Sequence, residues 1–217
     1  LEHPAREGDP LALTVNFCAP IARGEFRVAV RLARANRSSQ HWLVEFTQGE
    51  SVEAVLTATV VTAARRDSFS HQFAAMPEIP SWESLPTIPN PSRLSWVSQY
   101  EFRFAEGLLA LSETPPAPPQ SPRSLLWLRD APARPLDFLS LAAMSDAFFG
   151  RLFQVIGRIP PFGTVSLTTY FHAAADELQR HGTAPLAGVA DAHVFHRSFG
   201  DQTVQLHDAE GRLLATG

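Results

Sequence analysis

An internal repeat constrains the fold of this chain more than any other feature. Residues 13–19 (LTVNFCA) align with residues 167–173 (LTTYFHA) at a constant offset of 154 positions. Two further matches follow at an offset of 160: Arg37-Ser38 with Arg197-Ser198, and the turn at Gln48-Gly49 with the turn at Asp208-Ala209. A six-residue insertion in the second half accounts for the change of offset. The repeat predicts two halves of the same kind, each built from one helix and a meander of antiparallel strands.

Alternating apolar and polar residues mark the strands of both halves, as in residues 25–35. Proline-rich segments at residues 69–95 and 114–122 lack periodicity, and the first of them predicts a crossover linker. The pattern predicts further strands at residues 10–17, 40–47, 51–63, 97–104, 124–129, 187–195, 202–207 and 212–216.

Residues 135–172 hold the best candidates for catalytic residues in the second half, an acid on a predicted helix and hydroxyl groups on the strand that follows. An apolar stripe at three- to four-residue steps predicts one long helix over residues 136–157: Leu139, Ala142, Phe149 and Phe153. Asp146 falls inside that stripe. A carboxylate on a buried helix face is costly unless it is hydrogen-bonded or functional. Asp146 is therefore either a catalytic carboxylate or a structural one that accepts backbone hydrogen bonds or caps a break near Gly150.

The strand predicted at residues 163–172 gathers hydroxyl groups on one of its faces. The polar face carries Thr164, Ser166, Thr168 and Tyr170, and the other carries Val165, Leu167, Thr169 and Phe171. Thr164 is a candidate partner for Asp146, although threonine also favours strands for structural reasons. Ser166 is a candidate lining residue on the same face.

Composition and charge exclude several classes of function. The chain is 45% hydrophobic and 18% charged, which is typical of a folded protein, and its net charge of −4 gives no general attraction to nucleic acid or anionic membrane. Cys18 is the single cysteine, so neither an intrachain disulfide nor a CxxC metal site can form, and a reducing, cytoplasmic location is expected. No apolar run reaches the length of a transmembrane helix.

Other catalytic and binding motifs are missing from the sequence. It has no GxSxG elbow and no glycine-rich phosphate loop, so we expect neither a serine-hydrolase mechanism nor a cofactor. His193, His196 and His207 fall on strands and loops without a carboxylate partner, and we therefore expect no metal site.

Several stretches together resemble the acyl-CoA thioesterase II (TesB-like) family. In the first half these are residues 13–20 (LTVNFCAP) and the segment from Gly24 onward. The second half matches in order and spacing at Trp127-Leu128-Arg129, Pro135-Leu136-Asp137, Ser145-Asp146-Ala147, residues 163–172 and residues 208–215 (DAEGRLLA). The resemblance implies an α+β tandem (double) hotdog fold, in which two helix-wrapped antiparallel sheets join edge to edge. It also implies hydrolysis of an acyl-CoA substrate.

The resemblance implies roles for individual residues. Members of the family hold the hydrolytic water with an aspartate, a threonine or serine that opens the next strand, and a glutamine on the last strand. Asp146 and Thr164 match the first two, and the glutamine is expected a few residues after Ala215, beyond Gly217. The acyl chain would run along the helix–sheet seam near Phe148, Phe149 and Phe153, and Ser166 would line it. A backbone N–H at the N-terminal end of the helix would meet the oxyanion.

The two halves differ in what they offer. We expect a structural first hotdog over residues 1–80 and a catalytic second hotdog over residues 81–217. Pro10, which matches Thr164 at offset 154, has neither a hydroxyl nor an N–H. The partner of the 136–157 helix would fall before Leu1, so the first half is expected to lack most of its helix. Its bare sheet face would be covered by preceding residues or by another chain, in a homodimer or larger homo-oligomer.

Two alternatives to a thioesterase remain open from sequence. The first is a hotdog protein that binds acyl-CoA or another hydrophobic ligand without turnover. The second is a hydratase or dehydratase of the same fold, which ranks last because no histidine lies near Asp146 in the sequence.

Overall fold

The computed structural model describes residues 3–50, 53–66, 68–88, 95–112, 114, 116 and 118–217 of the chain. Antiparallel strands dominate it and helices are few, so the predicted α+β class is confirmed. The chain forms two compact units. The first comprises Leu1–Ser70 with Gly163–Ala174, and the second comprises His71–Phe162 with Ala175–Gly217.

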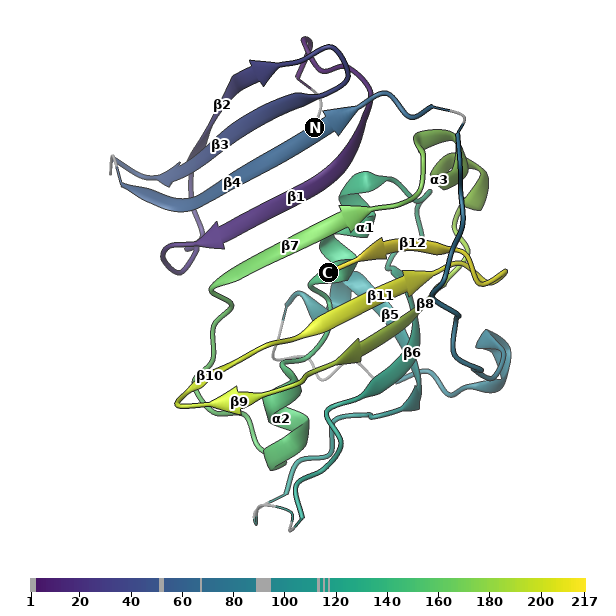
Figure 1. Ribbon diagram of the computed structural model, residues 1–217. Helices are drawn as coiled ribbons and strands as arrows, with labels where there is room; N and C mark the ends of the chain where they lie inside the picture. Colours follow the sequence, from purple (N-terminus) through teal and green to yellow (C-terminus); the bar gives the residue numbers. More distant parts are fainter. Residues whose placement is uncertain are drawn as a thin grey trace. The chain divides into compact units, whose positions relative to one another are not determined.

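Five antiparallel strands form the sheet of the first unit, in the order β2-β3-β4-β1-β7 (Figure 1). Their bounds are β1 (Asp9–Phe17), β2 (Phe26–Ala35), β3 (Gln40–Gln48), β4 (Ala54–Ala63) and β7 (Ser166–Phe171). The strands predicted at residues 10–17, 25–35, 40–47 and 51–63 are thus present with small differences at their ends. The strand predicted at residues 163–172 is shorter by three residues at its start and one at its end.

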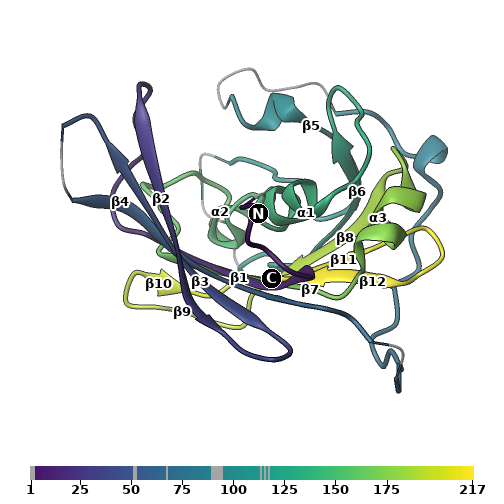
Figure 2. The same ribbon diagram turned by 90° about the horizontal axis from the view of Figure 1, so that it is seen from above.

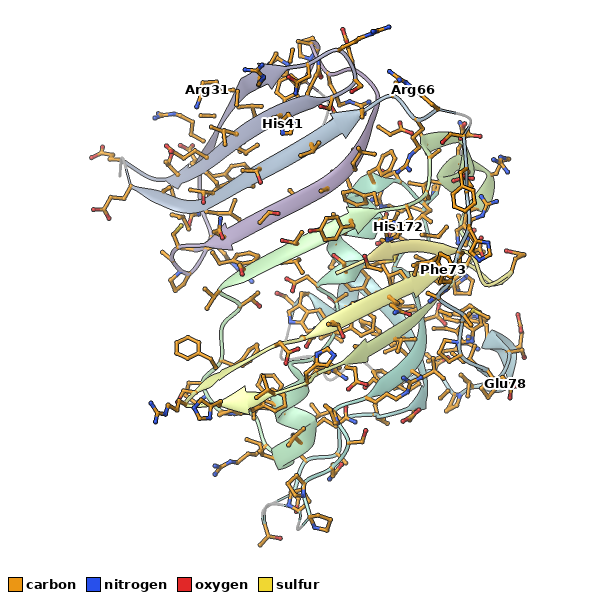
Figure 3. The ribbon with its side chains drawn as sticks, viewed as in Figure 1. Arg31, His41, Arg66, Phe73, Glu78 and His172 are labelled. Atoms are coloured by element: carbon orange, nitrogen blue, oxygen red, sulfur yellow. The ribbon has the colours of Figure 1, made fainter. Side chains whose placement is uncertain are left out.

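Register divides the sheet of the first unit into an apolar face and a polar face. Paired residues share a face, so Val30, Val44 and Ala58 lie on the same side of the sheet. Arg31 and His41, labelled in Figure 3, fall on the opposite side. The described part of this unit contains no helix, and Phe26 at the outer end of the apolar face is 62% exposed. Every residue of β2 is exposed.

The pairing of β1 with β7 confirms the alignment of the repeat at offset 154. Thr14 lies opposite Thr168, and these two residues are equivalent in the repeat. Their hydroxyl oxygens are 3.0 Å apart and share a hydrogen bond. Figure 1 shows β7 (green) beside β1 (purple), although 154 positions separate the two threonines. Identical residues facing one another indicate a local two-fold axis through this strand pair.

The sheet of the second unit also has five strands, in the order β12-β11-β8-β6-β5. Its three C-terminal strands repeat the order β4-β3-β2 of the first unit, as the repeat requires. The sheet curves around helix α1 (Figure 2). The strands are β5 (Tyr100–Glu106), β6 (Ser124–Asp130), β8 (Leu186–Asp191), β11 (Thr203–His207) and β12 (Leu213–Thr216). The core side chains include Leu126, Leu128, Leu141, Leu186 and Leu206, all with at most 1% exposure.

The proline-rich segment after residue 70 is fastened to the outside of β5 and β6. Trp82 lies in a short 3-10 helix (Trp82–Ser84), and the guanidinium carbons of Arg103 and Arg129 stand 4.1 and 4.8 Å from its ring centre. Glu101 pairs with both arginines, at 3.0 and 2.7 Å. The cation–π contacts tie the part of the segment around Trp82 to two arginines, which Glu101 holds in place.

The single long helix predicted over residues 136–157 is wrong. The chain instead forms α1 (Phe138–Ser145) and α2 (Arg151–Ile156), with a break between them at residues 146–150. Asp137 caps α1 by accepting a hydrogen bond from the Ser140 N–H at 2.7 Å. Gly150 is the N-cap of α2, and Gly157 ends it in the left-handed conformation.

The predicted apolar stripe is wrong as well. Leu139 is 51% exposed, whereas Leu141 and Met144 face the core together with Ser140 and Ser145. Asp146 is the C-cap of α1 and is exposed, so it does not lie on a buried helix face. Several further elements were not predicted: α3 (Ala175–His181), the hairpin of β9 (Phe195–His196) and β10 (Phe199–Gly200), and two short 3-10 helices, Trp82–Ser84 and Val97–Gln99.

Close packing of the break on β8 gives a prediction about stability. A Cβ on Gly188 would lie 2.7 Å from Phe148 Cζ and 3.1 Å from Leu128 Cδ2. We expect Gly188→Ala to lower the free energy of unfolding by about 1–3 kcal/mol because a buried ring must move. Urea denaturation measures this. Gly163→Ala is the matched control, because a Cβ there meets no described atom within 4 Å. Equal stability of the two variants would contradict the packing.

Candidate active site

Asp146 stands where α1 ends. Its backbone N–H donates to the carbonyl of Ala143 at 3.2 Å, which fixes the residue against the last turn of the helix. The carboxylate is exposed in the single chain, yet desolvation by the surrounding protein raises its pKa above the ordinary value. Exposure limits the size of this shift. The result is a carboxylate that solvent reaches and that holds its proton more tightly than free aspartic acid does.

Tyr100, at the start of β5, is close enough to feel the charge of Asp146. Burial raises the pKa of its phenol, and the negative charges of Asp130 and Asp146 raise it further. A raised pKa keeps the hydroxyl protonated at neutral pH, so Tyr100 can act as a hydrogen-bond donor. Sequence reasoning missed this residue because only strand pairing brings it near the helix.

A polar network ties the start of α1 to the end of β6. Ser140 donates from its hydroxyl to Asp130 at 2.5 Å, and Arg134 bridges Asp130 at 3.1 Å and Asp137 at 3.0 Å. Burial alone would raise the pKa of Asp137, but hydrogen bonds from Arg134 and from the backbone at Ser140 outweigh it and lower that pKa. This network fixes the N-terminal end of α1. It therefore fixes the orientation of the helix, and with it the position of Asp146 at the C-terminal end.

The predicted hydroxyl residues belong to the first unit, whereas Asp146 belongs to the second. Thr164 is exposed and precedes β7 by two residues. Ser166 opens β7 opposite Asn16 and is also exposed. His172, which carries the resemblance at the other end of the strand, follows directly after β7 (Figure 3). The use of one water by Asp146 and Thr164 stays a prediction.

The three predicted lining phenylalanines have different surroundings. Phe148 is buried against Gly188, and Phe153 is buried with its ring centre 5.1 Å from that of Phe162. Phe149 is half-buried, and its ring centre lies 5.4 Å from that of Trp96. Phe149 is therefore the member of the set that combines apolar contact with access to solvent.

The sequence-based statement that the histidines lack a carboxylate partner is wrong for His193. His193 Nδ1 lies 2.5 Å from Asp201, which also accepts the N–H groups of His193 and Val194 at 2.9 Å each. The pair closes the base of the β9–β10 hairpin. Within the described residues, no group of three or more His, Cys, Asp or Glu side chains could hold a metal ion.

Comparison with known proteins identifies the family. The profile described as "Acyl-CoA thioesterase C-terminal domain" matches residues 71–217, and "Acyl-CoA thioesterase N-terminal domain" matches residues 1–63. The chain belongs to the acyl-CoA thioesterase family. It is a thioester hydrolase on that basis, which confirms the predicted class of enzyme. No curated protein matches the chain.

Solved structures confirm the hotdog fold. A protein of unknown function with a hot dog fold from Alicyclobacillus acidocaldarius is 40% identical, with a TM-score of 0.91 over 99% of this chain and 78% of that chain. A putative thioesterase II from Thermobifida fusca is 19% identical, with a TM-score of 0.79 over 97% and 77%. The tesB protein of Mycobacterium avium subspecies paratuberculosis is 18% identical, with a TM-score of 0.74 over 96% and 75%. The last two likenesses concern the fold alone.

None of the helices in the described part of the chain has the length and hydropathy that a bilayer-spanning segment requires.

The His193–Asp201 pair gives a prediction about titration. The hydrogen bond to Asp201 raises the pKa of His193. Burial alone would raise the pKa of Asp201, but hydrogen bonds from His193 and the backbone lower it to about 2. The pair therefore stabilises the hairpin fully between the ordinary values of 3.8 and 6.5. Its contribution is lost as pH rises through the raised pKa of His193, or falls through the lowered pKa of Asp201.

We expect NMR titration of the His193 imidazole to give a pKa above 6.5. Asp201→Asn should lower that value, because the neutral amide no longer favours imidazolium. The same change at Asp176, which pairs with Arg180 instead, should leave the His193 titration unmoved. An unchanged His193 pKa in Asp201→Asn would rule out the ion pair.

Proposed function

We propose that this chain hydrolyses a fatty acyl-CoA thioester to the free acid and coenzyme A, using a water molecule held by Asp146 and Thr164. The observation that carries the proposal is the exposed carboxylate of Asp146 at the end of α1, in a chain of the acyl-CoA thioesterase family. Desolvation raises the pKa of that carboxylate, which makes it a better proton acceptor than free aspartate.

Asp146, Thr164 and one water molecule can account for hydrolysis of the thioester. Water is a weak nucleophile at neutral pH, so ionised Asp146 orients it and takes its proton as the oxygen attacks the thioester carbonyl. Thr164 holds the same water by a hydrogen bond. The tetrahedral intermediate then collapses, the carbon–sulfur bond breaks, and the thiolate of coenzyme A leaves and receives a proton. The products are the carboxylic acid and the free thiol.

A backbone N–H at the start of α1 does not suit the oxyanion. Helix α1 begins at Phe138, eight residues before Asp146, which corresponds to about 12 Å along a helix axis. The N-terminal end of α1 therefore lies at the opposite end of the helix from the proposed base, and the donor for the oxyanion must come from elsewhere.

The acyl chain is proposed to contact Phe149 rather than all three phenylalanines. Phe148 and Phe153 are core residues with at most 8% exposure, so they support the wall of the site from behind. Phe149 and Trp96 form an aromatic pair of which both members are half-buried. Aromatic surface of this kind binds alkyl chains through apolar contact.

The central test is substitution of the proposed base. We expect Asp146→Asn to lower kcat by about 100-fold or more, which is the usual scale for a general base, with KM little changed. Hydrolysis of acyl-CoA esters, followed with a thiol-reporting dye, measures this. Asp176→Asn, which removes an exposed carboxylate from α3, should retain full activity. Wild-type kcat in folded Asp146→Asn would end the catalytic assignment.

Thr164 is tested together with Asp146. We expect Thr164→Val to lower kcat by less than Asp146→Asn does. The double variant should be little worse than Asp146→Asn alone, because residues that act on one water are not additive. Independent, multiplying losses would show that the two side chains do not share a water.

Phe149 is tested through substrate chain length. We expect Phe149→Ala to raise KM for a long-chain acyl-CoA by about 10-fold, which corresponds to roughly 1.4 kcal/mol of apolar contact. KM for acetyl-CoA should change little. Phe199→Ala, which removes an exposed ring on the β9–β10 hairpin, is the control and should alter neither value. Equal effects of Phe149→Ala on both substrates would place the acyl chain elsewhere.

A further inference from the structure

Arg151 carries a charge that the proposed chemistry does not use. It is the first residue of α2 and is only 3% exposed. No carboxylate of the described residues lies within ion-pair distance of it. Burial lowers its pKa to about 10, and the more distant charge of Asp191 offsets this only in part. Burying a cation without an ion-pair partner costs free energy, and the hydrogen bonds of the guanidinium must offset that cost.

One edge of the Arg151 guanidinium donates hydrogen bonds to the break between α1 and α2. Its Nε donates to the carbonyl oxygen of Phe149 at 2.9 Å, and its Nη2 donates to the same oxygen. Inside a helix, that carbonyl would accept from the N–H four residues later. The side chain of Arg151 therefore replaces a helical hydrogen bond at the point where the helix is interrupted.

The other edge of the guanidinium donates hydrogen bonds to the start of β6. Nη1 donates to Ser124 Oγ at 2.6 Å, and to the carbonyl of Pro122 and to Gln154 Oε1 at 3.3 Å each. Ser124 donates in turn to the carbonyl of Gly107 at 2.7 Å. Gln154 donates to the carbonyls of Ser121 and Arg123. A buried network whose members are satisfied in this way is rigid.

The break that Arg151 holds is the segment that carries Asp146. Asp146 is fixed to α1 by its own N–H, Phe148 is packed on Gly188, and Phe149 is held by Arg151. These anchors, together with the Ala147 N–H that donates to the Met144 carbonyl at 3.1 Å, define a five-residue segment without regular structure. Without the anchor from Arg151 the segment is held through Asp146, Ala147 and Phe148, so the backbone that follows Asp146 can move and change the placement of its carboxylate.

We propose that Arg151 is a positioning residue for thioester hydrolysis: by tying the Phe149 carbonyl to β6, it fixes the backbone of the break and so the placement of Asp146. This inference rests on the proposed role of Asp146 as the base. A displacement of about 1 Å at a reacting group can cost about 100-fold in rate, so an anchor at this position matters to kcat.

The test uses Arg151→Lys, which keeps the charge but cannot reach the Phe149 carbonyl and Ser124 at the same time. With acetyl-CoA, whose KM is expected not to depend on Phe149, kcat should fall by about 10- to 100-fold with KM within about twofold. Amide hydrogen exchange in the peptide that spans residues 146–150 should become faster. Arg151→Met, which removes the charge as well, should show the same pattern and serves if the lysine variant does not fold.

The control is Gln40→Met in the first unit. Gln40 is also a buried polar side chain, and it clamps a loop through Glu7 and Ala5. We expect a comparable loss of melting temperature but an unchanged kcat and unchanged exchange in residues 146–150. If Gln40→Met lowers kcat as much as Arg151→Lys does, the effect is general destabilisation and the inference is overturned.

A double variant separates this inference from the proposed function. In the Asp146→Asn background, Arg151→Lys should cause no further loss of kcat, because it acts only through Asp146. A full additional loss would overturn the positioning role. If Asp146→Asn alone is fully active, the proposed function fails, and faster exchange in Arg151→Lys still shows that Arg151 anchors the break. Wild-type exchange and wild-type kcat in Arg151→Lys would overturn the inference itself.

Discussion

The antiparallel pairing of β1 with β7 is the constraint on which the first unit depends. It joins residues 154 positions apart and places equivalent residues of the repeat, Thr14 and Thr168, face to face. A strand from the second half of the sequence thereby completes the sheet of the first unit. Closing so long a loop is entropically expensive, so this pair depends on the sheets around it rather than on local preference.

The break between α1 and α2 is the corresponding constraint in the second unit. A continuous helix would satisfy its own backbone, whereas the observed break requires Gly150 as the N-cap of α2 and the guanidinium of Arg151 as the donor to the Phe149 carbonyl. In return, the chain presents Asp146 at a helix end, open to solvent, instead of inside a helical face. This exposure suits the proposed chemistry, because a base that activates water must be accessible to it.

The sequence allowed the β-strands, the repeat and the α+β class to be predicted, because alternation with a period of two is a local property. It could not reveal the break at Asp146, since the anchors of Phe148 and Phe149 come from β8 and from Arg151 through tertiary contacts. The apolar stripe that includes Leu139 and Phe153 predicted one continuous helix, whereas the molecule has two short helices in this region. Asp146 was found for a mistaken reason, as a buried acid, although it is exposed. Tyr100 and Arg151 gave no sequence pattern, because their importance arises from neighbours that are distant in the chain.

The central claim is that ionised Asp146 acts as the base and that the surrounding protein raises its pKa. The most direct measurement is the pH dependence of kcat/KM for the wild-type chain with one acyl-CoA. Because the base must be ionised, activity should fall as pH drops through the raised pKa, so the acid limb should have its midpoint above the ordinary value of 3.8. An acid limb at or below that value, or one that persists unchanged in the residual activity of Asp146→Asn, would contradict the account.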